Sequence, residues 1–380
     1  MKPSMSMEHA DILPHIILPL TEWYHAHARR LPWRAHPTPY RVWLSEIMLQ
    51  QTRVAAVMPY FDRFLAALPT VKSLAEADEE LLMKLWQGLG YYNRARNLQR
   101  AARIVQEKYH GHIPGDFDTL LTLPGIGRYT AGAISSIAYG ASHPAVDGNV
   151  LRVITRLTLY GEDILKDRTK RSVENELRGI YPAGSASVLN QALMELGATV
   201  CLPNGAPLCG ECPLHGLCLA RREQRIHEFP QKSKTKKRRV EELTVLLLEE
   251  DGKIALRKRG AKGLLAGLWE LPHLAGHRTR KEILSFLREH RLTPASVRPL
   301  PDAVHIFSHV EWRMKGWHVC LAPAWSVAEP ASLWGENAEL VWAASKEIQE
   351  DYSIPAAFQY FLPHDLKQQK QPKSDEGPDD

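Results

Sequence analysis

Four of the five cysteines of this 380-residue chain lie close together and could hold a metal. Their spacing is C-x7-C-x2-C-x5-C, and four thiolates with a C-x2-C pair among them predict a tetrahedral or cubane site. A structural zinc is the alternative to an iron–sulfur cluster, because zinc accepts four cysteines equally well. The predicted ligands are Cys201, Cys209, Cys212 and Cys218.

The same cysteines do not fit a zinc deaminase, which pairs H-x-E with a later P-C-x-x-C. Leu208, not proline, precedes Cys209, and the one H-x-E begins at His309, downstream of the cysteines. The fifth cysteine, Cys320, stands alone in an apolar run and is predicted to be a core residue.

A second group of residues suits a phosphate rather than a metal. The segment 123–131, Leu-Pro-Gly-Ile-Gly-Arg-Tyr-Thr-Ala, predicts a helix end, a tight turn and a new helix. Gly125 and Gly127 permit positive φ and leave backbone amides bare at a helix N-terminus, where a phosphate can bind. Such contacts position a duplex without reading its sequence. The segment 146–150, Val-Asp-Gly-Asn-Val, follows this hairpin.

Helices must position these groups, because helical periodicity dominates up to about residue 225. Residues 40–50 place their apolar side chains on one broad helix face, and Thr52 is predicted to cap a second helix that ends before Pro69. Strand-like runs are scarce, so this region is predicted to be all-α. Further helices are expected near 91–109, 127–139, 148–159, 170–180 and 186–200.

The pattern changes to mixed α and β after residue 229. Two apolar runs, 243–249 and 254–258, are joined through Asp251-Gly252, which predicts a β-hairpin. Further strands are expected at 303–310 and 317–321, with a helix at 281–291.

The length predicts two domains. We expect a helical domain at 8–225 that includes the cysteine loop 201–218, a basic linker at 226–241, an α+β domain at 242–366 and a disordered tail at 367–380. The net charge is +5, and residues 226–240 hold six basic residues against one acidic, which suits a polyanion such as nucleic acid or a solvated linker. No apolar run could span a bilayer and the start lacks a signal-peptide pattern, so a cytoplasmic protein is expected, with its thiols reduced.

The hairpin, the Val-Asp-Gly-Asn-Val segment and the cysteines together resemble the helix-hairpin-helix glycosylases of the endonuclease III superfamily. Within that superfamily, three further segments are similar to the MutY family of adenine DNA glycosylases. They are Leu-Pro-Trp-Arg at 31–34, Trp-Leu-Ser-Glu-Ile-Met-Leu-Gln-Gln-Thr at 43–52 and Gly-Leu-Gly-Tyr-Tyr at 88–92. The resemblance implies removal of adenine mispaired with 8-oxoguanine or guanine in double-stranded DNA.

The resemblance also implies which residues act. The acid of the family corresponds to Glu46 and its second carboxylate to Asp147. Cleavage of an N-glycosidic bond needs a proton on the departing base and a negative charge beside the oxocarbenium-like sugar. Glu46 is therefore expected to be buried and protonated, and Asp147 ionised. Tyr129 stands where bifunctional relatives carry a Schiff-base lysine, so a monofunctional enzyme is expected, with Tyr129 and Asn149 supporting the sugar and the water.

The family's DNA contacts map onto a further set of positions. An enzyme that extrudes a stacked base must fill the gap with a wedge. Gln51 and Tyr91 match the wedge residues, and Trp33, Arg34 and Gln191 match positions near the extruded adenine. Trp33 could equally be a core residue.

A [4Fe–4S] cluster, one per chain, is the cofactor that the resemblance implies for the four cysteines. The family's first cysteine gap is six residues, whereas here 202–208 makes seven. An added loop residue is sterically tolerable, so the cluster stays favoured over zinc.

The second domain resembles a Nudix fold through 245–258 and 263–272. A nucleotide pyrophosphohydrolase would need the glutamate-rich REUxEExGU helix to hold metal on a diphosphate, and the stretch after Pro272 lacks it. The domain is therefore predicted to be a damage-binding module. Phe307, Ser308 and His309 match the family's Phe-Ser-His segment, and Phe307 could equally be core.

Two other functions are less well supported. A pyrimidine-damage glycosylase-lyase is opposed by Tyr129 and by the second domain, and a non-catalytic mismatch-binding protein is opposed by Glu46 and Asp147. A monomeric adenine glycosylase is the leading prediction.

Overall fold

The computed structural model describes residues 12–182, 184–233, 237–322 and 340–366. It divides into two compact units. The first comprises Met1–Ala77 and Asn93–Lys234, and the second comprises Asp78–Tyr92 and Thr235–Asp380. The tail at 367–380, predicted to be disordered, falls outside the described residues.

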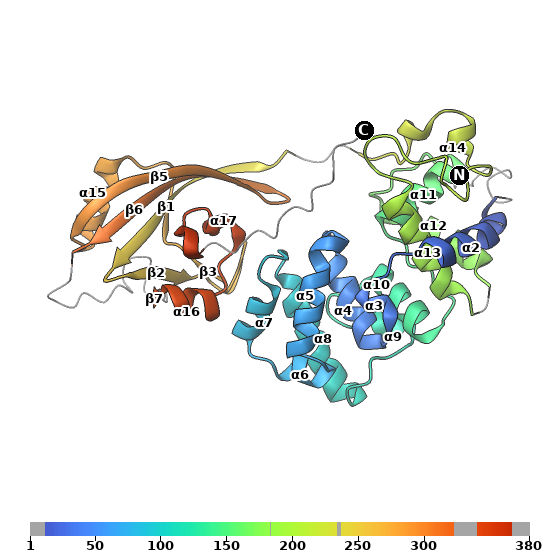
Figure 1. Ribbon diagram of the computed structural model, residues 1–380, viewed down its shortest axis with the longest axis horizontal. Coiled ribbons are helices and arrows are strands. Elements are labelled where there is room, and N and C mark those ends of the chain that lie inside the picture. Colours follow the sequence, from blue (N-terminus) through green and yellow to red (C-terminus); the bar gives the residue numbers. More distant parts are fainter. Residues whose placement is uncertain (1–11, 183, 234–236, 323–339, 367–380) are drawn as a thin grey trace. The chain divides into compact units, whose positions relative to one another are not determined.

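All regular elements among the described residues of the first unit are helical, as predicted (Figure 1). None of the helices in the described part of the chain is both long and apolar enough to cross a membrane. The first unit contains η1 (Leu13–Ile16), α2 (Ile17–His27), α3 (Pro32–Ala35), α4 (Pro39–Leu49), α5 (Val54–Ala67), α6 (Val71–Glu76), α8 (Asn93–Tyr109), α9 (Phe117–Leu121), α10 (Arg128–Ala133), the π-helical turn η2 (Ile134–Ala138), α11 (Gly148–Thr158), α12 (Asp167–Ile180), α13 (Ala186–Thr199), α14 (Leu219–Arg222) and η3 (Ile226–Glu228).

Helices α11 and α13 share one apolar core. Val150, Ile154 and Leu193 from these helices are fully buried in it. A Cβ atom added to Gly197 of α13 would lie 2.5 Å from the Cβ atom of Asn149, so this close approach requires glycine. The packing fixes the helix that carries Asn149.

One detail of the predicted helices was wrong. Helix α5 begins at Val54 with Arg53 as its N-cap, and the Thr52 hydroxyl accepts a hydrogen bond from Arg94 (3.2 Å) instead of capping the helix. The helix expected near 127–139 is confirmed, and it consists of α10 followed without a break by the π-helical turn η2.

The second unit is built on a mixed sheet, as the predicted α+β class requires (Figure 1). The strand order is β3-β2-β1-β6-β5, with β4 paired to β1 and β7 paired to β2. Strands β1 and β6 are parallel, and the other pairs are antiparallel. The elements of this unit are α7 (Glu79–Trp86), β1 (Arg239–Glu250), β2 (Lys253–Lys258), β3 (Trp269–Glu270), β4 (His273–Ala275), α15 (Arg280–Glu289), β5 (Pro294–Ile306), β6 (Val310–Leu321), β7 (Leu340–Ala344), α16 (Ser345–Glu350), α17 (Ala356–Gln359) and η5 (His364–Leu366).

Alternate residues of β1 serve the two faces of the sheet. Leu246 and Leu248 pack in a core that includes residues of α15. Val245 and Leu247 pack in a second core that includes Phe358 of α17. The sheet is therefore covered by apolar side chains on both faces.

The β-hairpin between β1 and β2 is confirmed. The chain turns at Asp251 (φ 47°) and Gly252 (φ 75°), and the two strands are antiparallel. Both residues adopt the positive φ that a tight hairpin turn needs, as the Asp-Gly pair predicts.

Two strand boundaries differ from the prediction. The expected strand at 303–310 is the end of β5 and the first residue of β6, joined by a turn at 307–309. The Phe307 amide closes this turn by donating to the Val310 carbonyl (2.8 Å). Strand β1 begins at Arg239, within the segment expected to be linker, because its register with β6 starts there.

Helix α7 comes from the N-terminal half of the chain but belongs to the second unit. The Lys84 ammonium donates to the carbonyls of Ile348 (3.3 Å) and Tyr352 (3.1 Å). The Gln87 side chain donates to the Ile354 carbonyl (3.1 Å). These bonds join α7 to the segment around α16.

Candidate active site and cysteine centre

Helix α4 carries a carboxyl group into the interior of the first unit. The helix begins with Pro39 after Thr38, whose hydroxyl accepts from the Arg41 amide (3.4 Å). Its apolar face buries Trp43 completely. Glu46 lies on the same helix and is only 6 % exposed. A buried carboxyl group is costly unless it is neutral or hydrogen-bonded.

The C-terminal end of α4 is capped by a guanidinium from α8. Arg94 is buried and donates to the carbonyls of Ile47 (2.9 Å), Met48 (2.8 Å) and Gln50 (2.5 Å). A cation at this end satisfies carbonyls that have no partner within the helix and interacts favourably with the helix dipole. Sequence reasoning missed Arg94.

Tyr129 on α10 supplies the side-chain contact of Glu46. Its hydroxyl donates to the Glu46 carboxylate and lies 3.3 Å from Met194 Sδ. Burial raises the pKa of Glu46 to about 7; the Tyr129 hydrogen bond and Arg34 act to lower it, and Asp147 acts to raise it. Burial and the neighbouring carboxylates hold the pKa of Tyr129 well above its usual value, so the phenol is a neutral donor.

Asp147 is the N-cap of α11. One carboxylate oxygen accepts from the Val150 amide (2.8 Å) and the other from the Asn149 side chain (2.8 Å). Burial raises the pKa of Asp147, and these hydrogen bonds together with Arg152 act against that rise. The capping position leaves the carboxylate at a helix N-terminus, where a negative charge is favoured.

Arg152 connects this helix to the cysteine-rich loop. Its guanidinium is buried and donates to Asn149 Oδ1 (2.8 Å), to the Gly197 carbonyl (2.6 Å) and to the Cys201 carbonyl (2.7 Å). Both polar atoms of the Asn149 side chain are therefore hydrogen-bonded, Nδ2 to Asp147 and Oδ1 to Arg152. Sequence reasoning missed Arg152.

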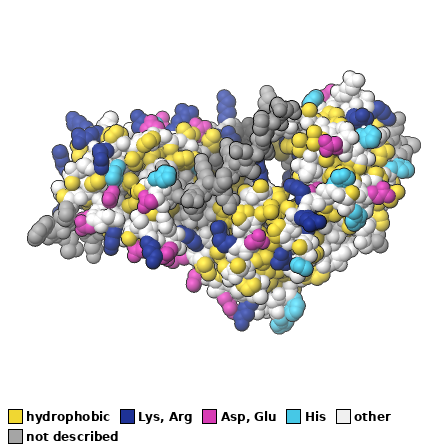
Figure 2. Space-filling view, viewed as in Figure 1, with side chains coloured by type: hydrophobic (Ala, Val, Ile, Leu, Met, Phe, Trp, Pro, Cys, Tyr) yellow, Lys and Arg dark blue, Asp and Glu magenta, His cyan; other side chains and the backbone are white. Residues whose placement is uncertain are grey.

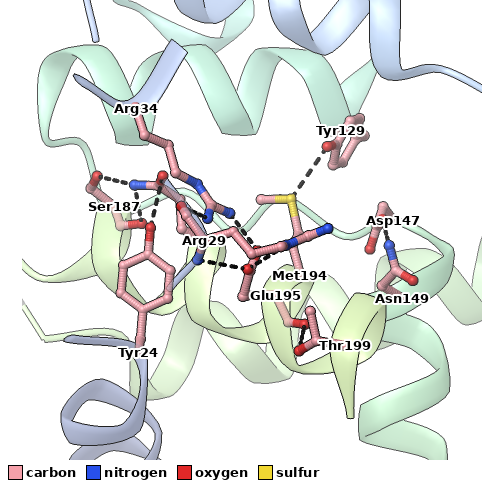
Figure 3. Close-up of polar contacts among 11 residues, drawn as sticks. Tyr24, Arg29, Arg34, Tyr129, Asp147, Asn149, Ser187, Met194, Glu195 and Thr199 are labelled. Carbon is pink, nitrogen blue, oxygen red and sulfur yellow. Dashed lines mark hydrogen bonds and ion pairs between the residues drawn. The ribbon is translucent and has the colours of Figure 1, made fainter. Parts of the chain in front are cut away.

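Helix α13 holds a second buried carboxylate (Figure 3). Glu195 is 1 % exposed and accepts from the Arg29 side chain (2.6 and 3.0 Å) and from Arg34 (2.8 Å). Burial alone would raise the pKa of Glu195, but the hydrogen bonds from Arg29 and Arg34 hold it at about 2. Figure 3 shows both guanidinium groups converging on Glu195.

Two residues expected near the adenine lie in this ion cluster or beside it. Arg34 is fixed by Glu195, and Gln191, one turn before Glu195, accepts from the Tyr24 hydroxyl (3.1 Å). Glu195 was missed, although its spacing from Gln191 (i, i+4) in a largely apolar helix is a signal that could have found it.

The third residue expected near the adenine is a core residue. Trp33 on α3 is buried and packs edge-on against Phe61, with 5.4 Å between the ring centroids. This position agrees with the alternative given for Trp33 from the sequence, that it is a core residue.

We expect Glu195→Gln to lower the free energy of unfolding by about 3 kcal/mol, because it leaves Arg34 partly buried without its counter-charge. Thermal denaturation at pH 7 measures the change. The same variant should also lower the rate of base release, through a misplaced Arg34. Glu22→Gln, at an exposed glutamate of α2, is the control. An unchanged melting temperature in E195Q would contradict a supporting role for the cluster.

The two hairpin glycines are exposed but differ in conformation. Gly125 has φ +79°, and a Cβ there would lie 2.7 Å from the Asn97 Cβ, so the turn requires glycine. Gly127 has φ −94°, so only Gly125 adopts the positive φ that both glycines permit. Gly127 is the N-cap of α10, and no side chain caps that helix end.

Gln51 and Tyr91 are exposed and share an unusual backbone conformation. Gln51 follows α4 with φ 58°, and Tyr91 has φ 48°. Residues with a side chain rarely adopt positive φ. Tyr91 is 48 % exposed, and its hydroxyl lies 2.8 Å from Ser308 Oγ within the second unit.

The Phe-Ser-His segment presents two of its three side chains to solvent. Ser308 and His309 are exposed. Phe307 is partly buried and packs edge-on against Trp312, with 4.8 Å between the ring centroids. Phe307 therefore lies at the edge of the core with its side chain partly exposed.

The four predicted metal ligands line one pocket. The sulfur of Cys201 accepts from Arg156 (3.3 Å), and Arg221 lines the same pocket. The loop of the seven-residue gap is closed by the Leu208 amide, which donates to the Val200 carbonyl (3.0 Å). Four thiols around a pocket with two cations fit an anionic metal–thiolate centre. The four are Cys201, Cys209, Cys212 and Cys218.

Comparisons with known proteins agree with this arrangement. The family model of HhH-GPD superfamily base excision DNA repair proteins matches residues 44–182, and a NUDIX domain model matches residues 243–364. The solved structure of a thermostable thymine-DNA glycosylase is 25% identical with a TM-score of 0.50, and the match covers 56% of this chain and 98% of that one. The helical fold and the family match define a base excision DNA glycosylase of the HhH-GPD superfamily.

Curated relatives show which family of base excision DNA glycosylases the chain resembles. The adenine DNA glycosylase of Rattus norvegicus is 33% identical over 409 residues, which cover 91% of this chain and 77% of the relative. The adenine DNA glycosylase of Buchnera aphidicola subsp. Acyrthosiphon pisum is 35% identical over 290 residues, which cover 76% of this chain and 81% of the relative. The chain belongs to the adenine DNA glycosylase family, and the resemblance found in its sequence is confirmed. It is an enzyme of base excision repair that removes adenine.

Proposed function

We propose that the protein excises adenine opposite 8-oxoguanine or guanine in duplex DNA and leaves an abasic site without cutting the strand. The observation that carries this proposal is the Glu46 carboxyl, buried, bonded to Tyr129 and with a pKa raised to about 7. A carboxyl with that pKa is about half protonated at neutral pH and can act as an acid.

The two carboxyl groups divide the chemistry. Glu46 donates its proton to a ring nitrogen of the extruded adenine, which makes the base a better leaving group. The C–N bond then breaks towards an oxocarbenium-like sugar, and Asp147 stabilises that positive charge. Water then adds to the sugar, and Glu46 takes a proton from that water. Tyr129 holds the Glu46 carboxyl and Asn149 holds the Asp147 carboxylate through their hydrogen bonds.

Tyr129 also bears on what happens after base release. A strand-cleaving relative would need an amine to attack the sugar and form a Schiff base. A neutral phenol that donates to Glu46 is not such a nucleophile. The abasic site is therefore left intact.

Local contacts in the described residues support DNA binding. Figure 2 shows Lys and Arg side chains interspersed with Asp and Glu on the visible face of each unit. The exposed turn with Gly125 and Gly127 suits a phosphate, because its backbone amides are accessible at the start of α10.

Four side chains are assigned to the flipped base and the gap it leaves. Gln51 and Tyr91 are exposed and both held at positive φ, and such strained conformations are typical of functional residues. We assign both as wedge residues. Arg34 and Gln191 are assigned as contacts to the extruded base, since Glu195 and Tyr24 hold them in place.

The second unit lacks the features of a pyrophosphohydrolase among its described residues. On α15, Glu282 serves in a capping box with Thr279 (2.7 Å) and is not free to hold a metal on a diphosphate. Glu270 is buried and paired with Arg257 and Arg259. These carboxylates are committed to the fold, which supports a binding role for this unit.

The second unit acts as the reader of the opposite base. Ser308 and His309 are exposed on the turn beside Tyr91, where they can reach an altered base edge. A hydroxyl and an imidazole can each donate and accept a hydrogen bond, which is what separates 8-oxoguanine from guanine at that edge.

We expect Ser308→Ala to lower the preference for 8-oxoguanine over guanine by about tenfold, because one hydrogen bond to the damaged base and one to Tyr91 are lost. Adenine release from both duplexes under single-turnover conditions measures the preference. Ser285→Ala, on α15 and bonded to Glu289, is the control. Equal losses on both duplexes would contradict the reader assignment.

We assign a [4Fe–4S] cluster to the four cysteines. In the described residues, the one set of three or more potential metal ligands whose ligand atoms lie within 4.8 Å of one another is Glu249, His318 and Cys320. The four thiols are therefore spread more widely than the roughly 3.8 Å between sulfur ligands of one tetrahedral zinc. When bound, the cluster supplies a cross-link for the loop at 201–218, whose Cys201 carbonyl accepts from Arg152.

Purified protein should contain about four iron and four sulfide per chain, with the visible absorption of such a cluster. Cys212→Ser should lose the iron, and Cys320→Ser should keep it, because Cys320 does not line the cysteine pocket. Stoichiometric zinc without sulfide in the wild type would overturn the cluster assignment.

One assay tests the proposed reaction. Duplexes with adenine opposite 8-oxoguanine are incubated with the protein, and free adenine and strand breaks are measured with and without hot alkali. Adenine release with breakage only after alkali supports the proposal. Breakage without alkali would indicate a lyase, and binding without adenine release a non-catalytic protein. A covalent adduct trapped by borohydride would also contradict it.

A further inference from the structure

Three potential metal ligands meet on two neighbouring strands of the second unit, and none of them belongs to the sites described above. Glu249 stands opposite Cys320 in the register of the parallel strands β1 and β6, and His318 precedes Cys320 by two residues. Residues two apart on a strand share a face. All three side chains are partly buried, so the prediction that Cys320 is a core residue is wrong.

The distances among the three ligand atoms suit one small cation. They all lie within 4.8 Å of one another. His318 Nε2 lies 2.7 Å from Glu249 Oε2 and 3.5 Å from Cys320 Sγ. A tetrahedral zinc with Zn–S of about 2.3 Å and Zn–N of about 2.0 Å places sulfur and nitrogen about 3.5 Å apart. The sulfur–nitrogen pair already has this spacing, and the nitrogen–oxygen pair has to open by about half an ångström to receive the ion.

We propose that Glu249, His318 and Cys320 form a binding site for a borderline divalent cation of the Zn²⁺ class. Sulfur, imidazole and carboxylate are the donors that zinc takes in proteins, whereas calcium and magnesium prefer oxygen alone. Binding releases the thiol proton of Cys320. His318 binds the ion through Nε2 as a neutral imidazole with its proton on Nδ1, so the ion replaces the hydrogen bond between His318 and Glu249. The fourth position is left to water.

The position of the site gives it a structural effect. Strands β1 and β6 are neighbours inside the sheet, and the ion joins them next to the apolar residues of their shared face, such as Leu247. Arg298 stands opposite His318 on β5, but it is exposed, so water screens its charge. The ion should stabilise the sheet. None of its ligands is a residue assigned to adenine release, so the inference does not rest on the proposed reaction.

Zinc uptake by the full-length purified protein tests the site. Wild type and variants are equilibrated with Zn²⁺, freed of loosely held ion by gel filtration, and analysed for zinc and iron. We expect the wild type to carry about one zinc per chain more than Cys320→Ala or His318→Gln, at equal iron content. Glu249→Gln should weaken binding at least about tenfold, because it removes the one charged oxygen donor. His290→Gln, at the C-cap of α15, is the matched control and should keep the added zinc.

A second readout separates binding from folding. Zn²⁺ should raise the melting temperature of the wild type and of His290→Gln, and leave that of Cys320→Ala and His318→Gln unchanged. Circular dichroism without zinc shows whether each variant is folded. Equal zinc content in the wild type and in both ligand variants, or an equal shift of the melting temperature, would overturn the proposal.

Discussion

Glu46→Gln is expected to lower the single-turnover rate of adenine release by about a thousandfold while leaving mismatch binding close to that of the wild type. The amide has the size of the carboxyl and can still accept from the Tyr129 hydroxyl, so the site keeps its shape. It has no proton of suitable acidity to give to the leaving base. Single-turnover release of adenine and a gel-shift titration on the same duplex measure the two effects.

Glu107→Gln on α8 is the matched control for Glu46→Gln, because its side chain is exposed. It should change neither the rate nor the binding. A Glu46→Gln enzyme that releases adenine within tenfold of the wild-type rate would contradict the role of Glu46 as the acid.

The pKa of Glu46 also sets a pH dependence. The acid must be protonated, so the rate of the wild type should be highest below pH 7 and fall about tenfold for each pH unit above it. The raised pKa of Glu46 also makes the free energy of unfolding depend on pH. The stabilisation that comes from the protonated carboxyl is fully present below pH 4.5 and is lost as the pH rises to about 7. Relative to the wild type, Glu46→Gln should therefore gain about 2.5 kcal/mol in the free energy of unfolding between about pH 5 and pH 8. A pH-independent difference between the two proteins would contradict the raised pKa.

Asp147→Asn is expected to lower the rate of adenine release at least about a hundredfold with little change in stability. Asparagine caps a helix about as well as aspartate, so the bond from the Val150 amide is kept. The negative charge beside the sugar is lost. Single-turnover kinetics and thermal denaturation of the same preparation separate the loss of charge from a loss of fold.

Asp116→Asn makes the same chemical change at another helix N-cap, where the Asp116 carboxylate accepts from the Thr119 amide (2.8 Å) on α9. It should leave the rate of adenine release unchanged. If Asp116→Asn and Asp147→Asn reduced the rate alike, capping rather than charge would explain the effect of Asp147.

Elements with local signals could be predicted from the sequence. The periodicity of 40–50 predicted α4, and the Asp251-Gly252 pair predicted the β-hairpin. The prediction that Thr52 caps α5 was wrong because the Thr52 hydroxyl accepts a hydrogen bond from Arg94. Arg94 lies 42 positions later in the chain, and no local sequence pattern indicates this partner.

The residues of the candidate site also divide into those that a sequence motif indicates and those that it does not. Motif resemblance indicated Glu46, Asp147 and Tyr129, and the structure brings Tyr129 to Glu46 across 83 positions of the chain. It could not indicate Arg152 or Glu195, because each acts through groups brought together only by packing.

The Phe-Ser-His segment shows the same limit on a smaller scale. Its apolar neighbours predicted a continuous strand at 303–310. The bond between the Phe307 amide and the Val310 carbonyl makes it a turn instead, and this turn exposes Ser308 and His309.

The bonds of helix α7 have a consequence for how the protein is made. The Lys84 ammonium binds carbonyls that lie 264 and 268 positions later in the chain, and Gln87 binds one that lies 267 positions later. At about 5–20 residues per second, a ribosome needs roughly 10–50 seconds to synthesise that stretch. During this time α7 lacks these partners, although the helices on either side of it in the sequence are already made. Chains arrested on the ribosome before Ile348 should therefore be cut by trypsin after Lys84 faster than released full-length chains.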